Sequence, residues 1–369
     1  MTAIITSLLG GGWELVAGWV LPTALNSVLF GVLVLPAFRR VSGLGPIAMA
    51  SNPEKALALL AGAVIGGLVL SALQTPLYRV LEGYRGMPAR LRHWRIQRHI
   101  GRKHLLEKRL RVARLSFRET RGSLRPGEAA DLARLRKDPV LSNVPETTGK
   151  LSPVTISVLA EKYRRYPVDD GQVLPTRLGN AIRRFEEYGY DRYRLDAVTM
   201  WNALVGVVPD GVRKRVDSSR VGVDFFVCLL YGQFILALCG VAALITAPGD
   251  RAGAIVAIAV PLVLIPVWYR LAVEATDEWA AAFRGLVDIG RRPLADALGL
   301  ALPATLEQER RMWQLASRFS RRPYSATDAE LDQFRVSACA GPRQPGRRRA
   351  VQPPRGGNRR PRGPLGPVP

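Results

Sequence analysis

Four long apolar stretches interrupt a chain that is otherwise rich in arginine. Each holds roughly 18 to 24 residues, and a helix that rises about 1.5 Å per residue needs about 20 residues to cross a hydrocarbon core. Core helices of water-soluble proteins are usually shorter, and they are apolar on one face only. The pattern therefore predicts four transmembrane helices, at about residues 15–38, 56–77, 222–246 and 252–270.

The start of the chain differs from a secretory signal peptide, which has a basic first region and a short apolar core. Residues 1–12 carry no charged side chain, and the apolar stretch that begins at Leu15 is too long for such a core. The first apolar helix is therefore expected to remain in the protein as a membrane span.

Basic residues gather on one side of the expected membrane. The chain has 369 residues, is 48% hydrophobic and carries a formal net charge of +23. Residues 79–220 hold 31 Lys or Arg and 16 Asp or Glu, and residues 270–369 hold 18 and 10, whereas the Asp250–Arg251 connection is neutral. Because cytosolic loops carry the excess of Lys and Arg, this bias predicts a multi-pass protein with both termini in the cytosol. Arg39 and Arg40, which follow the first span, run against that orientation.

Composition divides the chain into five parts. Residues 1–78 hold the first transmembrane pair, and residues 221–270 hold the second. Residues 79–220 between them form a basic cytosolic helical domain, and residues 271–340 continue as a cytosolic helical extension. Residues 341–369 are rich in Pro, Gly and Arg, with eight Arg and no acidic residue, a composition that predicts a disordered basic tail. The predicted fold class is an all-α integral membrane protein.

The stretch from Pro88 to Gly122 has no internal proline and predicts one long basic helix. Residues 79–125 hold 15 Lys or Arg against three Glu. Each basic side chain near an anionic membrane surface contributes about 1 kcal/mol, so membrane lipids are the expected partner. An acidic protein partner stays open, whereas nucleic acid is disfavoured because the sequence holds no recognisable nucleic-acid-binding module. The expected contact residues are Arg90, Arg92, Arg95, Arg98, Arg102, Lys103, Lys108 and Arg109.

The stretch PTRLGNAIRRFEEYGYDRYRLDAVTMW, residues 175–201, combines turn formers, aromatic rings and charges. A first helix with Leu178 and Ile182 on one face is expected to end at Gly189, and Asp196 can cap a second helix. The pattern predicts a helical hairpin that forms one structural unit. Its expected members are Thr176, Arg177, Gly179, Asn180, Tyr193, Asp196 and Trp201.

The order PTRLGN, then YDRYRLDAV, then a Trp resembles a pattern of uncharacterised multi-span membrane proteins of high-GC bacteria. The resemblance covers residues 165–205 or so. It implies a protein of the bacterial cell (inner) membrane, and it implies no particular activity, so no functional residue carries over from it.

The second apolar stretch contains Gly62 and Gly66, a GxxxG pair of the kind that lets two membrane helices approach closely. This pair is the expected helix-packing site. It also predicts a homo-oligomer that forms through the second span.

No arrangement typical of catalysis, cofactor binding or metal binding occurs in the sequence. The histidines His93, His99 and His104 are six and five residues apart, whereas helical metal pairs are three or four residues apart. Asp169 and Asp170 lie in a glycine-containing turn, where aspartate is a common turn former. We therefore expect no catalytic residue, no cofactor and no metal.

These patterns favour a non-enzymatic scaffold or accessory protein that displays a basic cytosolic helical domain at the inner membrane surface. A subunit of a transporter or channel is the first alternative. Such proteins usually carry polar or ionisable groups within their spans. Here the polar side chains within the spans are few, chiefly Asn26, Tyr231 and Gln233. A membrane-anchored enzyme of unknown reaction is the second alternative.

Overall fold

The structure, a computed structural model, describes residues 12–38, 47, 49, 51–141, 152–246 and 251–336. Within these ranges the chain forms helices and turns, with one isolated bridge between Leu300 and Arg335 and no strand. The expected all-helical class is confirmed for this part of the chain. The expected disordered tail at residues 341–369 lies outside the described residues.

The elements follow one another along the chain, with η1 a π-helix and η2, η3 and η5 3₁₀ helices. Their bounds are η1 (Val16–Val20), α2 (Leu21–Leu33), η2 (Leu35–Phe38), α4 (Asn52–Ala72), α5 (Gln74–Leu81), α6 (Ala89–Thr120), α7 (Pro126–Arg136), α9 (Pro153–Arg164), η3 (Asp170–Gln172), α10 (Arg177–Glu186), α11 (Tyr188–Tyr193), α12 (Trp201–Val207), α13 (Asp210–Thr246), α14 (Arg251–Ala297), α15 (Leu306–Arg321) and η5 (Ala326–Phe334).

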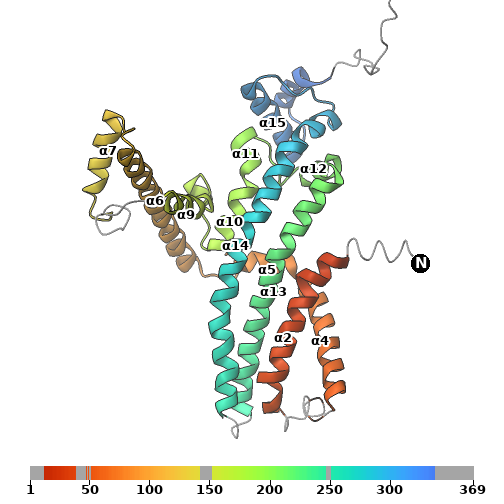
Figure 1. Cartoon of the computed structure of the whole chain (residues 1–369). Helices are drawn as coiled ribbons and strands as arrows, with labels where there is room; N and C mark the ends of the chain where they lie inside the picture. Colours follow the sequence, from red (N-terminus) through yellow and green to blue (C-terminus); the bar gives the residue numbers. More distant parts are fainter. Residues whose placement is uncertain are drawn as a thin grey trace, which may run out of the picture.

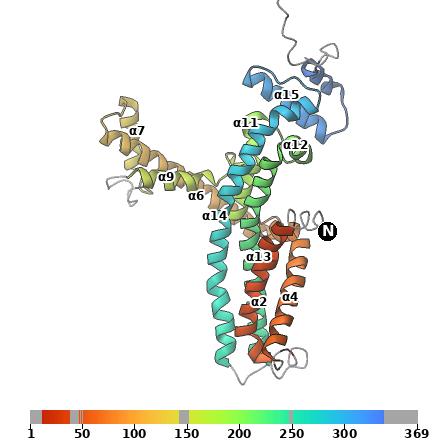
Figure 2. The ribbon, with the colours of Figure 1, turned by 45° about the vertical axis from the view of Figure 1, so that its right-hand side comes forward.

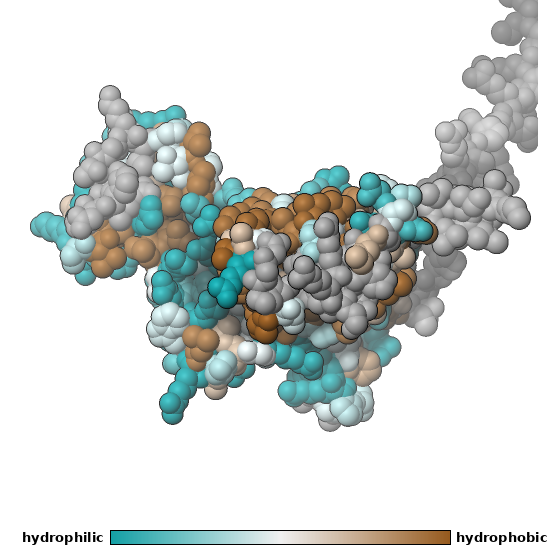
Figure 3. Space-filling model, turned by 90° about the horizontal axis from the view of Figure 1, so that it is seen from below, coloured by the Kyte–Doolittle hydropathy of each residue, from teal (hydrophilic) through white to brown (hydrophobic). Residues whose placement is uncertain are grey.

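Four helices are long and apolar enough to cross a membrane, as the hydrophobic pattern predicts. They are the helical stretch Gly12–Leu33, α4, α13 and α14. Their apolar parts stand side by side as a bundle in the lower half of Figure 1. Val32, Leu57 and Leu238 are 66%, 68% and 69% exposed on this bundle, and apolar residues cover much of it when it is seen from below (Figure 3). So large an apolar surface is unfavourable in water and favourable in lipid, which identifies a membrane protein.

The long helices α13 and α14 pack along each other and extend far beyond the apolar bundle (Figures 1 and 2). They have 37 and 47 residues, so at about 1.5 Å per residue they are roughly 55 and 70 Å long, against about 30 Å of hydrocarbon. The domain limits expected at residues 220/221 and 270/271 therefore fall inside single helices. The upper halves of α13 and α14 carry the helical domain with no linker between bundle and domain.

Polar side chains join α2 to α13 inside the bundle. Gln233 donates a hydrogen bond from Nε2 to Asn26 Oδ1 at 2.7 Å, and the Asn26 amide donates to the Cys228 carbonyl at 3.4 Å. Gly232 leaves room for the Asn26 amide, because a Cβ at residue 232 would overlap it. Hydrogen bonds between membrane helices contribute about 0.6 to 2 kcal/mol. In this structure Asn26 and Gln233 therefore serve as contacts between helices.

The second apolar helix ends earlier than the pattern predicts. α4 stops at Ala72, and the chain bends at Leu73 into α5, which crosses the upper end of the bundle instead of continuing a span to residue 77 (Figure 1). Gln74 and Tyr78 of α5 donate hydrogen bonds to Asp224 of α13, at 3.0 and 2.7 Å. The bend supplies these partners to a buried carboxylate, which would be costly to bury without them.

The helical domain has one continuous core around the upper halves of α13 and α14. α10, α11 and α12 pack against α14, and α15 covers the far end of the domain. The ring of Phe185 lies 4.8 Å from that of Trp279 and 5.3 Å from that of Phe283. Trp313 of α15 is fully buried in the same core.

The helices α6, α7 and α9 form an arm beside this core. α6 begins near the upper end of the bundle and rises away from it, so its first turns lie closest to the bundle (Figures 1 and 2). Small apolar clusters hold the arm together, with Leu132 of α7 and Leu159 of α9 both packed on α6. Arg165 ties the arm to α14 through an ion pair with Asp277 at 2.5 Å.

The glycines of α4 meet η1 and α2 of the same chain at a different position from the expected one. A Cβ at Gly67 would lie 2.9 Å from the Cα of Val20 in η1, and a Cβ at Gly66 would lie 3.1 Å from the Cγ2 of Thr23 in α2. A Cβ at Gly62 would meet nothing within 4 Å. Gly67 thus forms the contact with η1 and Gly66 the contact with α2, and a homo-oligomer through the second span stays a prediction.

Replacing Gly67 with Ala should destabilise the protein by about 1 to 3 kcal/mol, because the new methyl group forces η1 away from α4. Gly62→Ala is the matched control, and it should be neutral or slightly stabilising because alanine favours a helix. Chemical unfolding of both purified variants in detergent measures the difference. Equal stability of the two variants would contradict the packing of Gly67 against η1.

Candidate functional site

The start of α10 is fastened to α14 by residues of the PTRLGN motif. Thr176 accepts a hydrogen bond from the Gly179 N–H at 3.0 Å and so caps the helix. The Tyr269 hydroxyl of α14 accepts hydrogen bonds from the N–H groups of Arg177 and Leu178, at 3.1 and 3.2 Å. The first turn of a helix has free N–H donors, and Tyr269 uses two of them. The position of Arg177 is therefore fixed relative to α14.

Two further motif residues shape the approach to α10. A Cβ at Gly179 would lie 2.6 Å from the Glu82 carbonyl oxygen, so only glycine lets the end of α5 come this close. Asn180 is 1% exposed, and its amide binds both the N–H and the carbonyl of Leu174 at 2.8 Å. Thr176, Arg177, Gly179 and Asn180 thus form one local unit where α5, α10 and α14 meet.

The remaining motif residues lie farther along the domain. Tyr193 donates a hydrogen bond to Asp288 of α14 at 2.8 Å, and Trp201 stacks on a phenylalanine ring of the same helix with centroids 5.4 Å apart. Asp196 forms an ion pair with Arg321 of α15. These contacts attach the chain between α10 and α12 to α14 and α15, and they leave Tyr193, Asp196 and Trp201 outside the unit at Thr176.

The chain from α10 to α12 forms three short helices where a hairpin of two was expected. α10 ends at Glu186, and Gly189 lies inside α11 instead of ending the first helix. A Cβ at Gly189 would lie 2.7 Å from the Leu195 carbonyl oxygen, so the glycine serves a close approach. Arg194, with a φ of 64°, ends α11 in the left-handed region, and α12 begins at Trp201.

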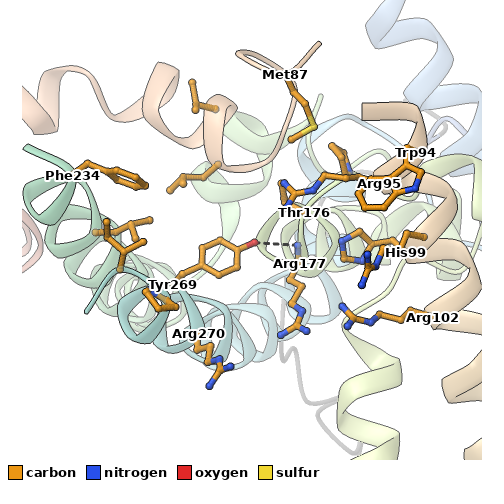
Figure 4. Close-up of a pocket in the computed structure, with 17 residues that line it drawn as sticks. Met87, Trp94, Arg95, His99, Arg102, Thr176, Arg177, Phe234, Tyr269 and Arg270 are labelled. Atoms are coloured by element: carbon orange, nitrogen blue, oxygen red, sulfur yellow. Dashed lines mark hydrogen bonds between the residues drawn. The ribbon is translucent and has the colours of Figure 1, made fainter. Parts of the chain in front are cut away.

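A cavity of about 640 Å³ lies between the first turns of α6, the start of α10 and the long helices (Figure 4). One wall is apolar and belongs to the bundle, with Phe234 of α13 and Ile265 of α14. The other wall is basic, with Arg95 and Arg102 of α6 and Arg177 of α10. None of the residues that line this cavity is an Asp or a Glu. The cavity therefore joins a strongly positive wall to an apolar wall that continues into the bundle.

A second cavity of about 380 Å³ adjoins the first. Both are lined by Arg102, Arg177 and Arg270, together with Tyr269. The acidic residue that lines the second cavity is Glu274. We call the two cavities together the arginine cleft, after Arg95, Arg98, Arg102, Arg177 and Arg270.

Several arginines of the domain meet an acid, as Arg291 does with Glu309 at 2.5 Å. Arg98 lies over the ring of Trp94, with its guanidinium carbon 5.3 Å from the ring centroid. The exposed cleft arginines whose guanidinium groups make no hydrogen bond or ion pair to any described residue are Arg95, Arg102, Arg177 and Arg270. A group of like charges in one cleft attracts anions.

The structure divides the eight basic residues that the sequence indicated on α6. Some of them line the cleft, while Arg90 and Arg92 are exposed at the start of the helix and line neither cavity. Those in the cleft are Arg95, Arg98 and Arg102, which line the first cavity, and Arg109, which with Arg102 lines the second.

The two lysines of that set contact acids of the arm. Lys103 is 4% exposed and pairs with Asp170 at 2.6 Å, and His104 binds the second oxygen of the same carboxylate at 2.7 Å. Lys108 pairs with Asp138 at 2.8 Å. Lys103 thus stabilises the packing of α6 on the loop after α9, and it does not belong to the exposed basic surface.

Sequence reasoning did not assign Arg270 or Arg177 to a binding surface. The sequence indicates Arg177 only as a member of the structural motif, although helix N-termini commonly bind anions. Arg270 is the last residue of the fourth apolar stretch, and a basic residue at the end of a span is a usable signal of an interfacial position. The fold was needed to bring both beside α6.

His99 lies in the wall of the first cavity and is buried, with 9% exposed. Its Nδ1 lies 3.1 Å from the Tyr166 hydroxyl. Burial lowers the pKa of His99 to about 4, and the nearby charges of Arg102, Arg177 and Arg95 add to this effect. The imidazole is therefore neutral at neutral pH, and it adds no charge to the cleft.

The described residues contain no group of three or more His, Cys, Asp and Glu side chains that could hold a metal ion. Asp170, in the expected turn, is engaged by Lys103 and His104. The polar residues inside the bundle, Asn26 and Gln233, line neither cavity of the cleft. The arginine cleft combines arginines that have no acidic partner among the described residues with an apolar wall, and it is the candidate site.

Comparisons of the chain with protein-family models, with curated proteins and with solved structures gave no match.

Acidification should destabilise the contact between α6 and the start of α10. Because folding lowers the pKa of His99, the unfolded chain binds more protons between pH 6.5 and 4, so stability falls as the pH falls through that window. The replacement His99→Gln should flatten this part of the profile, while His93→Gln, at an exposed position, should leave it unchanged. Thermal melting of the purified proteins between pH 7 and about 4.5 provides the measurement. Identical profiles for wild type and His99→Gln would contradict the prediction.

Proposed function

We propose that the protein is a non-enzymatic scaffold or accessory protein that displays its helical domain at the inner surface of a bacterial cell membrane. The observation that carries the proposal is the continuity of α13 and α14 from the apolar bundle into the domain. Two packed helices without a break hold the domain at a fixed height and orientation above the bilayer. A protein that presents a surface to a partner at the membrane needs this property.

The proposed topology has four spans in two hairpins, with the domain and both termini in the cytosol. Support comes from the connections within each hairpin. The end of α2 and the start of α4, like the end of α13 and the start of α14, lie at the end of the bundle away from the domain (Figures 1 and 2). The basic residues of the chain concentrate on the domain side, which the positive-inside rule places in the cytosol. In this arrangement α6 starts at the membrane surface, where anionic lipid is its proposed partner.

The structure offers less support for the two alternatives. A transporter or channel needs a path, yet Asn26 and Gln233 are hydrogen-bonded to each other in the bundle and line neither cavity of the arginine cleft. An enzyme needs a reactive side chain in its site. The histidine that lines the first cavity is His99, and because its Nδ1 is engaged by the Tyr166 hydroxyl it offers little support for an enzyme.

The topology can be tested with a reporter that is active only outside the cytosol. It should be active when inserted at Asp250 and silent when fused after Gly122 or Gly341, because only the first position lies on the far side of the membrane. Activity in whole cells is the measurement, and an equal amount of each fusion protein is the control. Activity after Gly122 would reverse the proposed orientation.

The scaffold function can be tested by site-specific photo-crosslinking in intact cells. A photoreactive residue at Tyr190 or Val198 should capture protein, because these side chains are 41% and 51% exposed on the domain. The same residue at Leu262, which is 57% exposed on the bundle, should capture lipid and serves as the control.

The purified protein in liposomes should in addition leave ion gradients and small solutes undisturbed. Two outcomes would count against a scaffold. One is lipid adducts alone at all three positions, and the other is solute flux that depends on the protein, which would favour the transporter alternative.

A further inference from the structure

We infer that the arginine cleft binds the phosphate headgroup of an anionic membrane lipid, whose acyl chains lie along the apolar wall of α13 and α14. Arg102, Arg177 and Arg270 line both cavities, and Arg95 and Arg98 extend the basic wall of the first cavity along α6. The inference rests on the proposed membrane position of the bundle. It goes beyond that function because it assigns a defined site and a class of ligand.

The first argument is the charge of the site. The guanidinium groups of Arg95, Arg102, Arg177 and Arg270 come from three helices and have no acidic partner among the described residues. Like charges in one cleft repel one another, and a bound anion relieves the repulsion. Phosphate suits this arrangement because arginine can bind it with two parallel hydrogen bonds, which a lysine cannot do.

The second argument is that the fold fixes the cationic groups in place. Arg177 is the first residue of α10, and Tyr269 holds the backbone there with two hydrogen bonds. Arg270 is the next residue after Tyr269 on α14, so one contact positions both arginines.

The third argument separates a lipid from a soluble anion. The wall opposite the arginines consists of Leu230, Phe234, Ile265 and Pro266. Figure 4 shows Phe234 at one end of the cavity and Arg95, His99 and Arg102 at the other. Phe234 is 45% exposed, and it lies within the apolar surface that the bundle presents to lipid. A soluble phosphate would leave this wall uncovered, whereas a lipid places its phosphate on the arginines and its chains on the wall.

Trp94 supports the same position of the cleft relative to the bilayer. It is 53% exposed on the first turns of α6, and the Arg98 guanidinium lies over its ring. Tryptophan is enriched at the headgroup level of membranes, where one side of the ring is apolar and the other is wet. The cleft therefore opens at the level where a lipid phosphate would lie.

The test uses the full chain purified in nanodiscs of phosphatidylcholine, with and without phosphatidylglycerol. Bound phosphatidylglycerol is counted by native mass spectrometry after release into detergent. The cleft variant carries Arg102→Gln, Arg177→Gln and Arg270→Gln. The control variant carries Arg114→Gln, Arg121→Gln and Arg134→Gln, which remove the same charge from exposed positions of the arm that line neither cavity.

Wild type and the control variant should retain phosphatidylglycerol over phosphatidylcholine. The cleft variant should retain it at least about tenfold less, because each hydrogen bond to a charged group contributes a factor of about ten or more. Inorganic phosphate and glycerol phosphate should not displace the lipid. If the cleft variant fails to fold, as judged by its helical circular dichroism, the single replacement Arg270→Gln replaces it and should lower retention several-fold.

Three results would overturn the inference. Equal retention by the cleft variant and wild type would mean that the lipid binds elsewhere, and equal loss in both triple variants would mean a general response to charge. Displacement by inorganic phosphate would assign the cleft to a soluble anion. A failure of the proposed orientation would appear in the reporter fusions and not in this binding assay, so the two can be told apart.

Discussion

The packing of α13 against α14 supports both the apolar bundle and the core of the helical domain, and a different force acts in each. In the bundle, lipid chains are as apolar as the helix surfaces, so burial provides no hydrophobic force between helices. There α2 depends on hydrogen bonds and close contacts, such as Gln233 with Asn26. In the domain, water surrounds the same helix pair, and Phe185 and Trp313 are buried by the hydrophobic effect. One pair of helices therefore serves both environments.

The arginine cleft follows from where the chain leaves the bundle. Asp224 on α13 binds Gln74 and Tyr78, and these bonds keep α5 across the top of the bundle. Gly179 then lets the start of α10 approach the end of α5. With α5 and α10 in these positions, α6 begins beside α14 and is directed away from it, which leaves a wedge between them. The wedge is basic on one side and apolar on the other because α6 is a basic helix and the lower half of α14 belongs to the bundle.

The sequence predicts the elements of this fold well and their junctions poorly. The four apolar helices and α6 are visible in the chain because apolar content, length and helix breakers act locally. The bend after Ala72 brings Gln74 to Asp224, which lies 150 residues later in the chain. The cleft likewise depends on a contact between distant residues, because the Arg177 N–H donates to the Tyr269 hydroxyl 92 residues later in the chain. Lys103 resembles its neighbours in the sequence, and only its contact with Asp170 shows that it is internal.

The basic residues of the chain have two separable roles, and their geometry distinguishes them. Membrane orientation depends on the number of basic residues near the ends of the spans and not on their exact partners. A binding site depends on where the charges meet. The arginines at 95, 102, 177 and 270 come from three helices that share no local sequence, yet they face one cleft. An anionic lipid bound there would stabilise the arrangement in which α6, α10 and α14 are together, by an amount that grows with the concentration of that lipid in the membrane. The position of the arm would then depend on the lipid composition of the membrane, without any movement of α13 or α14.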